Sequence, residues 1–213
     1  MDKSPEQEES KESFIDLGVA LNLEGLVLEQ AHILAKQIKG KAKYVFTLDE
    51  NALPHITLFQ GRFVEGVEGR LEELLKELLK EGIGELEMED RLFFRPNGNV
   101  FWNVKDNQVL RDLHEKLNTL LISETQGLLM DQFQKIIDDP NASETDKLQI
   151  KKYGALLAGD KFLPHVTLGR LINLEDRKLL EDIKVPTLTF HPKHFILGNL
   201  GSYGEVKTVI SNY

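Results

Sequence analysis

The chain has 213 residues, of which 41% are hydrophobic and 29% charged, and it carries no cysteine and a formal net charge of −9. This length allows one sizeable core or two small lobes that share a core, while the lack of cysteine excludes disulfides and thiolate metal sites. The acidic charge argues against a broad nucleic-acid groove, which needs basic residues to neutralise many phosphates.

The sequence carries no signal for a membrane or secreted protein. No apolar run approaches the length of a transmembrane helix, and the N-terminus has no apolar segment of signal-peptide type. Residues 1–12 are polar and acidic, which is typical of a disordered tail. We therefore expect a cytoplasmic monomer with one folded domain over residues 13–213.

The first half of the chain predicts an alternation of strands and helices. Residues 24–39 have apolar residues at helical spacing, with Gly40 placed to end the helix. Residues 67–81 predict a second, strongly amphipathic helix with leucines on its inner face and Gly82 after it. Strands are expected at 14–22, 43–48, 54–59, 85–94 and 99–104. The last two flank an Arg-Pro-Asn-Gly segment, which is typical of a tight hairpin.

The second half begins with a helix that Asp106 could cap and that extends to about residue 122. Residues 124–160 are rich in Gln, Lys and Asp and predict one or two helices, interrupted at Asp139-Pro-Asn. Ser143 and Asp146 resemble a capping box for the second of them. The remaining elements are expected to be a strand at 164–170, a short helix at 174–183 and strands at 187–190, 193–199 and 205–210. A Gly-Ser-Tyr-Gly turn at 201–204 joins the last two strands.

This order of elements indicates an α+β fold. Strands and helices alternate, but several neighbouring strands are joined by short turns, which favours antiparallel or mixed sheets over a doubly wound sheet. The sequence contains neither of the common glycine-rich phosphate loops, which disfavours a Rossmann or P-loop nucleotide site.

A repeated hexapeptide is the most informative feature of the sequence. Residues 53–58 read Leu-Pro-His-Ile-Thr-Leu, and residues 163–168, about half the chain later, read Leu-Pro-His-Val-Thr-Leu. A single His-x-Thr in a strand is common and is usually structural. Two copies that share Pro, His and Thr favour a functional role, with each copy contributed by one of two related lobes to a shared cleft.

Alternation in a strand places residues i and i+2 on the same face. His55 therefore projects with Thr57, and His165 with Thr167. Two imidazoles across a cleft can act as a general acid and a general base near neutral pH. The two threonine hydroxyls can hydrogen-bond the non-bridging oxygens of a phosphoryl group, where negative charge accumulates. This scheme predicts phosphodiester chemistry without a metal or another cofactor.

The paired motifs resemble those of the two-histidine (2H) phosphoesterase superfamily, and in particular its LigT-like branch of RNA 2′,3′-cyclic phosphodiesterases and 2′-5′ RNA ligases. The resemblance implies two pseudo-symmetric α+β lobes with mixed or antiparallel sheets around a central cleft. It also implies His55 and His165 as catalytic residues, Thr57 and Thr167 as phosphate-binding residues, and a nucleotide or RNA end as the substrate. Residues 124–160 depart from the family pattern as a helical insertion that could serve as a lid or a partner surface.

Other residues are weaker candidates for substrate contacts. Arg170 follows the second motif, and Arg62 takes a similar place after the first, but strand alternation puts Arg170 on the face opposite to the motif histidine. Tyr203 lies in the last turn and could line the cleft. Phe59 and Trp102 could stack on a base, although a core role competes in each case.

The remaining histidines do not suggest a metal site. His191 and His194 flank a proline without helical spacing or an obvious third ligand, so they make a poor zinc site and are expected at the surface. His32 and His114 lie on predicted helices beside apolar stripes and are expected to reach solvent.

The leading hypothesis is a metal-independent cyclic phosphodiesterase that opens nucleoside or RNA-terminal 2′,3′-cyclic phosphates to 2′-phosphates, as the resemblance implies. Within the enzyme class, a 2′-5′ oligoadenylate, a small cyclic phosphate derived from ADP-ribose, or RNA ligation stays open. A non-catalytic module that binds a nucleotide such as AMP is the second class. The third is an interaction protein that docks through residues 124–160. The sequence does not assign which histidine is the acid and which the base.

Overall fold

The computed structural model describes residues 13–48, 52–78, 80 and 83–213. The tail predicted at 1–12, and residues 79 and 81 of the helix predicted at 67–81, lie outside these described residues. None of the described helices is long and apolar enough to cross a membrane.

The structure contains five α-helices and three short 3-10 helices in its described part. The α-helices are α1 (Gly25–Lys41), α2 (Glu68–Leu78), α3 (Gln108–Leu121), α4 (Asp131–Asp138) and α5 (Glu144–Tyr153). The 3-10 helices are η1 (Ile122–Thr125), η2 (Gly159–Lys161) and η3 (Leu174–Leu180). The strands are β1 (Phe14–Asn22), β2 (Tyr44–Thr47), β3 (His55–Val64), β4 (Leu86–Phe94), β5 (Asn99–Val104), β6 (His165–Leu171), β7 (Thr189–Phe190), β8 (Phe195–Leu200) and β9 (Val206–Asn212).

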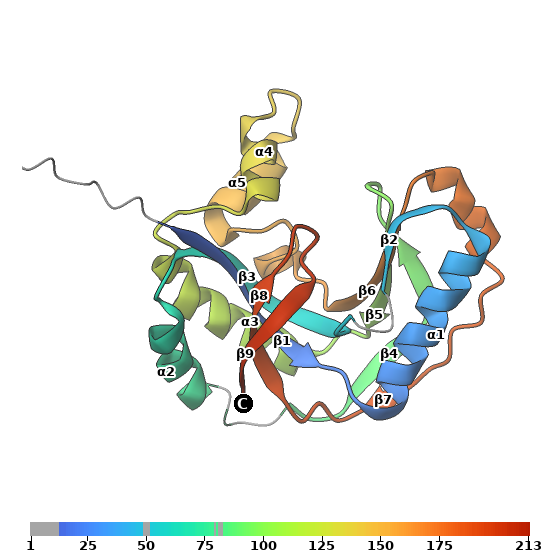
Figure 1. Cartoon of the computed structure of the whole chain (residues 1–213), viewed down its shortest axis with the longest axis horizontal. Helices are drawn as coiled ribbons and strands as arrows, with labels where there is room; N and C mark the ends of the chain where they lie inside the picture. Colours follow the sequence, from blue (N-terminus) through green and yellow to red (C-terminus); the bar gives the residue numbers. More distant parts are fainter. Residues whose placement is uncertain (1–12, 49–51, 79, 81–82) are drawn as a thin grey trace, which may run out of the picture.

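The nine described strands form one curled sheet in the order β7-β4-β5-β6-β3-β1-β8-β9, with β2 paired to β6 (Figure 1). Every pairing among them is antiparallel. The predicted α+β class is confirmed, and the two lobes are the two halves of this single sheet. The motif strands β3 and β6 are neighbours at its centre, and each is flanked on its outer side by another strand of its own half, β1 beside β3 and β5 beside β6.

Two helices pack in equivalent ways on the two halves of the sheet. Helix α1 follows β1 but packs against β6 of the other half, and α3 follows β5 but packs against β3. The apolar stripe predicted for α1 is confirmed, because its members are buried in the main core: Val27, Ala31, Leu34 and Ile38. Each half of the sheet is therefore covered by a helix that begins in the other half, which fixes the two motif strands relative to one another.

Two details of the predicted helices are wrong, and the type of a third was left open. Helix α1 continues through Gly40 to Lys41, because a glycine inside a helix lowers its stability without forcing it to end. The cap of α3 is Asn107, whose side-chain oxygen accepts a hydrogen bond from the Leu110 amide at 3.0 Å. Asp106 instead pairs with Arg111. The short helix near residue 174 is a 3-10 helix.

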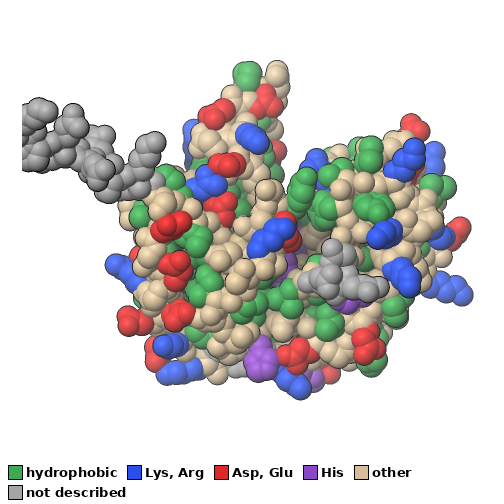
Figure 2. Space-filling model, viewed as in Figure 1, with side chains coloured by type: hydrophobic (Ala, Val, Ile, Leu, Met, Phe, Trp, Pro, Cys, Tyr) green, Lys and Arg blue, Asp and Glu red, His purple; other side chains and the backbone are tan. Residues whose placement is uncertain are grey.

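Helices α4 and α5 form a hairpin that projects from the rest of the molecule, and Figure 2 shows it as a ridge on the surface. They are separated at the predicted Asp-Pro-Asn break, and the Ser143 hydroxyl accepts a hydrogen bond from the Asp146 amide. The hairpin and the segment after it have a small core of their own, formed by Met130, Phe133, Ile150, Ala155 and Ala158. We keep the name insertion for residues 126–158, which lie within the segment that the sequence predicts to be an insertion at 124–160.

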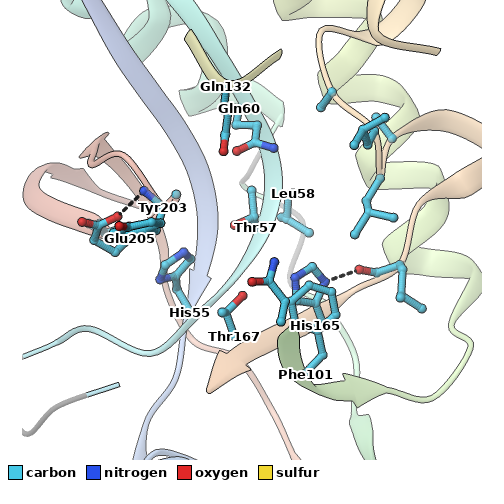
Figure 3. A pocket seen from close by; sticks show the side chains of 18 of the residues that line it. His55, Thr57, Leu58, Gln60, Phe101, Gln132, His165, Thr167, Tyr203 and Glu205 are labelled. Atoms are coloured by element: carbon cyan, nitrogen blue, oxygen red, sulfur yellow. Dashed lines mark hydrogen bonds between the residues drawn. The ribbon is translucent and has the colours of Figure 1, made fainter. Parts of the chain in front are cut away.

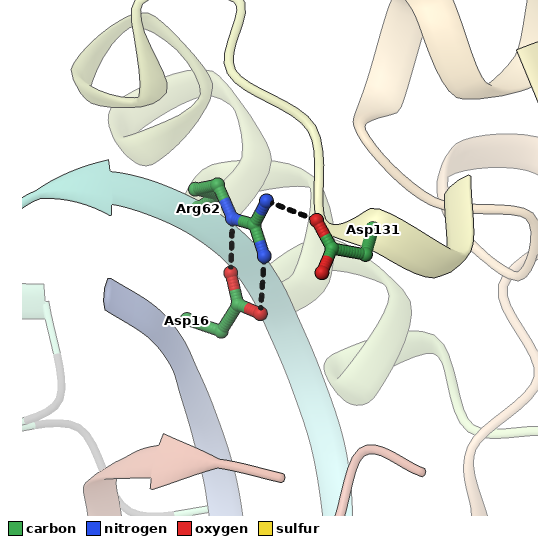
Figure 4. Close-up of polar contacts among 3 residues, drawn as sticks. All are labelled: Asp16, Arg62 and Asp131. Atoms are coloured by element: carbon green, nitrogen blue, oxygen red, sulfur yellow. Dashed lines mark hydrogen bonds and ion pairs between the residues drawn. The ribbon is translucent and has the colours of Figure 1, made fainter. Parts of the chain in front are cut away.

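An arginine ties the insertion to the sheet. The Arg62 guanidinium on β3 donates two hydrogen bonds to the Asp16 carboxylate on β1, at 2.8 and 3.0 Å, and a third to Asp131 at the start of α4, at 2.5 Å (Figure 4). Hydrogen bonding to Asp16 raises the pKa of Arg62, so the guanidinium stays charged. Arg62 thus has a structural role and does not line the central cavity.

We expect Arg62→Met to lower the free energy of unfolding by about 2 kcal/mol, because it leaves the partly buried Asp16 carboxylate without its charged partner. Urea denaturation followed by circular dichroism measures this change. Lys80→Met, which removes an exposed pair with Glu77, is the control and should change stability by less than about 0.5 kcal/mol. Equal effects of the two substitutions would contradict the tethering role.

Candidate active site

The two copies of the motif meet at the centre of the sheet. Ile56 pairs with Val166 at the bridge that joins β3 to β6, and both side chains are fully buried. Because the strands are antiparallel, positions on the two sides of this bridge face each other in reverse order. The sequence repeat therefore becomes a local two-fold relation about the bridge.

This relation places the motif side chains in one group. His55 lies opposite Thr167, and Thr57 lies opposite His165, all on the face away from the two bridge side chains. The four residues are half-buried and line one cavity of about 860 Å³ (Figure 3). The structure thus brings together residues that are far apart in the sequence.

Both imidazoles are held in the same way. Nδ1–H of His55 donates to the Leu53 carbonyl at 2.8 Å, and Nδ1–H of His165 donates to the Leu163 carbonyl at 2.6 Å. Since a carbonyl oxygen only accepts, Nδ1 must carry a proton in each ring. Nε2 is therefore the nitrogen that can gain or lose a proton at each histidine. The Leu-Pro-His sequence supplies both the ring and the carbonyl that fixes its tautomer.

The surroundings of the two rings differ. Burial lowers the pKa of His165 to about 4, and the charges of His55 and Arg95 act in the same direction. Burial also lowers the pKa of His55, but hydrogen bonding to the backbone of Leu53 and Gly204 and the charge of Glu205 oppose this change. The neighbouring charges thus favour the protonated form of His55 and oppose the protonated form of His165.

A β-bulge follows the motif in both copies. Opposite β1, the register shifts between Thr57 and Phe59, which leaves Leu58 as an extra residue. Opposite β5, the same shift occurs between Thr167 and Gly169. An extra residue reverses the alternation of side chains beyond it. In both strands, the residue five positions after the motif histidine therefore lies on the same face as that histidine.

The bulge explains where Arg170 lies. Simple alternation predicts that it points away from the histidines, and this is wrong: Arg170 lines the cavity, and its Nε donates to the Asn97 carbonyl at 2.9 Å. The residue at the same position after the first motif is Gln60, which also lines the cavity. Sequence reasoning compared Arg170 with Arg62 and so missed Gln60.

Of the three aromatic residues predicted as possible substrate contacts, two line the cavity and one does not. Tyr203 is half exposed, lines the cavity and stacks on Phe46 of β2 with ring centroids 4.7 Å apart. Phe59 reaches the cavity but is mostly core, with its ring tilted against Phe63. Trp102 is fully buried, does not line the cavity, and donates from Nε1 to the Glu89 carbonyl. Its role is in the core, so we exclude it from the site.

Several neighbours of the motif histidines were not singled out from the sequence. Phe101 of β5 stacks on the His165 ring with centroids 3.7 Å apart. Asn22 pairs with His55 across β1 and β3, and Asn103 pairs with His165 across β5 and β6. Each asparagine has a buried side-chain oxygen with no partner among the described residues. These equivalent positions extend the local two-fold relation beyond the hexapeptide, and only the sheet register reveals them.

His114 does not reach solvent as predicted. It is buried, stacks on Phe162, and its Nδ1–H donates to the Leu58 carbonyl at 2.6 Å while Nε2 accepts from the Gly159 amide at 2.8 Å. Burial lowers its pKa, which favours the neutral ring that this arrangement requires. The neutral ring joins α3 to the bulge after the first motif and to Gly159, directly after the insertion.

The other histidines lie apart from the site. His191 and His194 are exposed, and His194 pairs with Glu24. Within residues 13–48, 52–78, 80 and 83–213, no group of three or more His, Asp or Glu side chains is arranged to hold a metal ion.

Comparisons with known proteins find relatives through structure only. No protein-family model and no curated protein sequence matches the chain. The E. coli LigT structure with 3′-AMP matches with a TM-score of 0.57 and 16% identity, over 94% of this chain and 98% of that one. The complex of LigT with NADP+ matches at 0.55 and 14%, over 93% and 96%. A protein from Thermus thermophilus matches at 0.55 and 18%, over 93% and 97%.

The chain has the LigT-like fold. The resemblance inferred from the paired motifs is thus confirmed at the level of the fold, which is that of the two-histidine phosphoesterases.

Proposed function

We propose that this protein is a cyclic phosphodiesterase that hydrolyses nucleoside or RNA-terminal 2′,3′-cyclic phosphates to 2′-phosphates, by acid–base catalysis between His55 and His165 without a metal ion. The main support for this proposal is one observation. Two histidines with the same fixed tautomer and two threonine hydroxyls surround one cavity about a local two-fold relation.

The reaction uses the asymmetry between the two rings. Neutral His165 takes a proton from water at Nε2 as the water oxygen bonds to phosphorus. Protonated His55 donates its Nε2 proton to the ribose 3′ oxygen as the bond from phosphorus to that oxygen breaks. Thr57 and Thr167 donate hydrogen bonds to the non-bridging oxygens. We assign His165 as the base because the charges of His55 and Arg95 oppose its protonation, and His55 as the acid because the Gly204 backbone and Glu205 favour its protonated form.

The comparisons support a nucleotide as the ligand. E. coli LigT, which shares this fold, has been crystallised with NADP+ and with 3′-AMP. The cavity of about 860 Å³ is toward the upper end of the range for small-molecule sites, so a nucleotide is within its capacity.

The direct test is hydrolysis of the four nucleoside 2′,3′-cyclic monophosphates in the presence of EDTA, with the products separated by chromatography. We expect turnover to the 2′-phosphate. Products that are 3′-phosphates would reverse the assigned leaving group, and turnover that requires added metal would contradict the mechanism. Binding without turnover would favour a nucleotide-binding module.

We expect kcat/KM to have an acidic optimum. As the pH falls through about 4, His165 of the free enzyme becomes protonated and can no longer act as the base. As the pH rises through the pKa of His55, which lies below its usual value of 6.5, the acid is lost. Rates measured from pH 3.5 to 8.5 should therefore give a bell-shaped profile with its maximum below neutral pH.

Glu205→Gln tests the assignment of the acid. Because the charge of Glu205 raises the pKa of His55, its loss should move only the alkaline limb, toward lower pH. Glu115→Gln, at an exposed position of α3, is the control and should leave both limbs in place. If Glu205→Gln moved the acidic limb instead, the roles of the two histidines would have to be exchanged.

A further inference from the structure

The cavity is asymmetric beyond its four central side chains. Strands β3 and β6 run in opposite directions from the Ile56–Val166 bridge, so the equivalent residues Gln60 and Arg170 lie on opposite sides of the motif residues. A neutral amide stands at the β3 end, and a guanidinium stands at the β6 end. The two ends of the cavity are therefore suited to different parts of a ligand.

None of the described residues that the insertion contributes to the cavity wall is charged, although the Lys152 ammonium lies over the ring of the wall residue Tyr153, 4.6 Å from its centroid. Among the described residues that line the cavity, those with charge are Arg95, Arg170, Glu205 and Lys207, which belong to the β4–β5 turn, β6 and the β8–β9 hairpin. The insertion instead contributes the half-buried apolar side chains Ile136, Tyr153, Leu156 and Leu157. This wall fits a neutral group with apolar faces and is unsuited to a phosphate.

Two amides provide the polar groups beside this wall. Gln60 on β3 and Gln132 on α4 both line the cavity, and Figure 3 draws both side chains on the same side of Thr57. The ion pair between Arg62 and Asp131 holds the two backbones together, because these residues are close in sequence to Gln60 and Gln132. Neither amide has a hydrogen-bond partner within the described part of the chain.

A nucleobase has the properties that this end of the cavity requires. It is a neutral ring with apolar faces and with donors and acceptors along its edge, and glutamine amides can pair with such an edge through one donor and one acceptor. An aliphatic chain would leave both amides unpaired, at a cost in binding. A phosphate would find no cation among the described residues with which the insertion lines the cavity.

We propose that the insertion forms a base-binding subsite, in which Gln60 and Gln132 hydrogen-bond the edge of the base that belongs to the nucleoside bearing the cyclic phosphate. The faces of the base lie against Tyr153 and the aliphatic side chains of the insertion. The phosphates on the 5′ side of the same nucleoside extend toward Arg170 and Arg95. This inference rests on the proposed function for the identity of the ligand, and it adds the direction in which the ligand lies.

The test compares Gln60→Leu and Gln132→Leu with Gln134→Leu. Gln134 is exposed on the same helix and bonds only to Asp138, so its replacement is a matched control. We expect kcat/KM for the preferred nucleoside 2′,3′-cyclic monophosphate to fall about tenfold in each of the two subsite variants, mainly through KM. Differences among the four bases should shrink, and the control should behave as wild type.

A substrate without a base separates the subsite from the catalytic centre. The rate with methyl riboside 2′,3′-cyclic phosphate should be the same in wild type and in both subsite variants. Unchanged KM values for all four nucleotides in these variants would overturn the proposal, as would an equal loss with the substrate that lacks a base.

Equilibrium binding keeps this test distinct from the test of catalysis. Titration calorimetry with the four nucleoside 2′-monophosphates measures base preference whether or not the protein turns over a cyclic phosphate. A base preference that both subsite variants lose, in a protein without turnover, would support the subsite and refute the proposed reaction. Turnover together with binding that is independent of the base would support the proposed reaction and refute the subsite.

Discussion

His55→Ala and His165→Ala are each expected to lower kcat for a nucleoside 2′,3′-cyclic monophosphate by about 10²–10⁴-fold, which is the usual loss when a general acid or base is removed. The reason lies in the geometry of the site. Each ring has its Nδ1 proton engaged by a backbone carbonyl, so proton transfer depends on a single nitrogen per histidine. No other histidine in the described part of the chain lines the cavity except His114, whose two ring nitrogens are both engaged.

The controls separate chemistry from folding. His191→Ala replaces an exposed histidine outside the cavity and should retain wild-type rates. The double variant at positions 55 and 165 should have a kcat only slightly below that of the less active single variant. The losses from removing an acid and a base that act in the same step are not additive. If either single variant kept a near wild-type kcat with an unchanged thermal unfolding curve, the paired mechanism would be wrong.

The pH profiles of the single variants carry further information. His165→Ala should lose the acidic limb of the residual rate, and His55→Ala should lose the alkaline limb, since each limb reports one ring. Loss of the same limb in both variants would mean that the two groups titrate as a coupled pair and that neither can be assigned alone.

The sequence predicted which motif side chains share a face, because alternation in a strand is a local rule. One repeated hexapeptide is enough to place His55 beside Thr57 and His165 beside Thr167. The β-bulge is different: an extra residue in a strand leaves no compositional mark when both neighbours are apolar, as Leu58 and Phe59 are. The orientation of Arg170 and the importance of Gln60 followed from the bulge and were therefore missed.

Other errors arose where tertiary contacts override local signals. His114 lies on the buried face of α3, and its ring is satisfied by a carbonyl of β3 and an amide at the end of the insertion. Nothing near His114 in the sequence indicates these partners. Phe101 likewise acquires its place beside His165 only through the pairing of β5 with β6. Long-range register, rather than composition, determines which residues surround the motif.

Thr57→Val and Thr167→Val are expected to lower kcat by about 10²-fold each, because each substitution removes one hydrogen-bond donor to the phosphoryl oxygens in the transition state. Valine keeps the branched shape of threonine, so the strand and the packing around the bridge should be retained. The local two-fold relation predicts similar losses at the two positions. Rates with saturating cyclic nucleotide measure both variants.

Thr57→Ser and Thr167→Ser are the matched substitutions, since serine keeps the hydroxyl and loses only a methyl group. They should retain most of the wild-type kcat. If serine and valine were equally harmful, the role of the threonines would lie in packing, and if valine were harmless, the hydroxyls would not contact the phosphate. A large loss at only one of the two positions would show that the phosphate lies off the local axis, nearer to the histidine opposite that threonine. The threonine variants therefore locate the phosphate within the cavity as well as test its contacts.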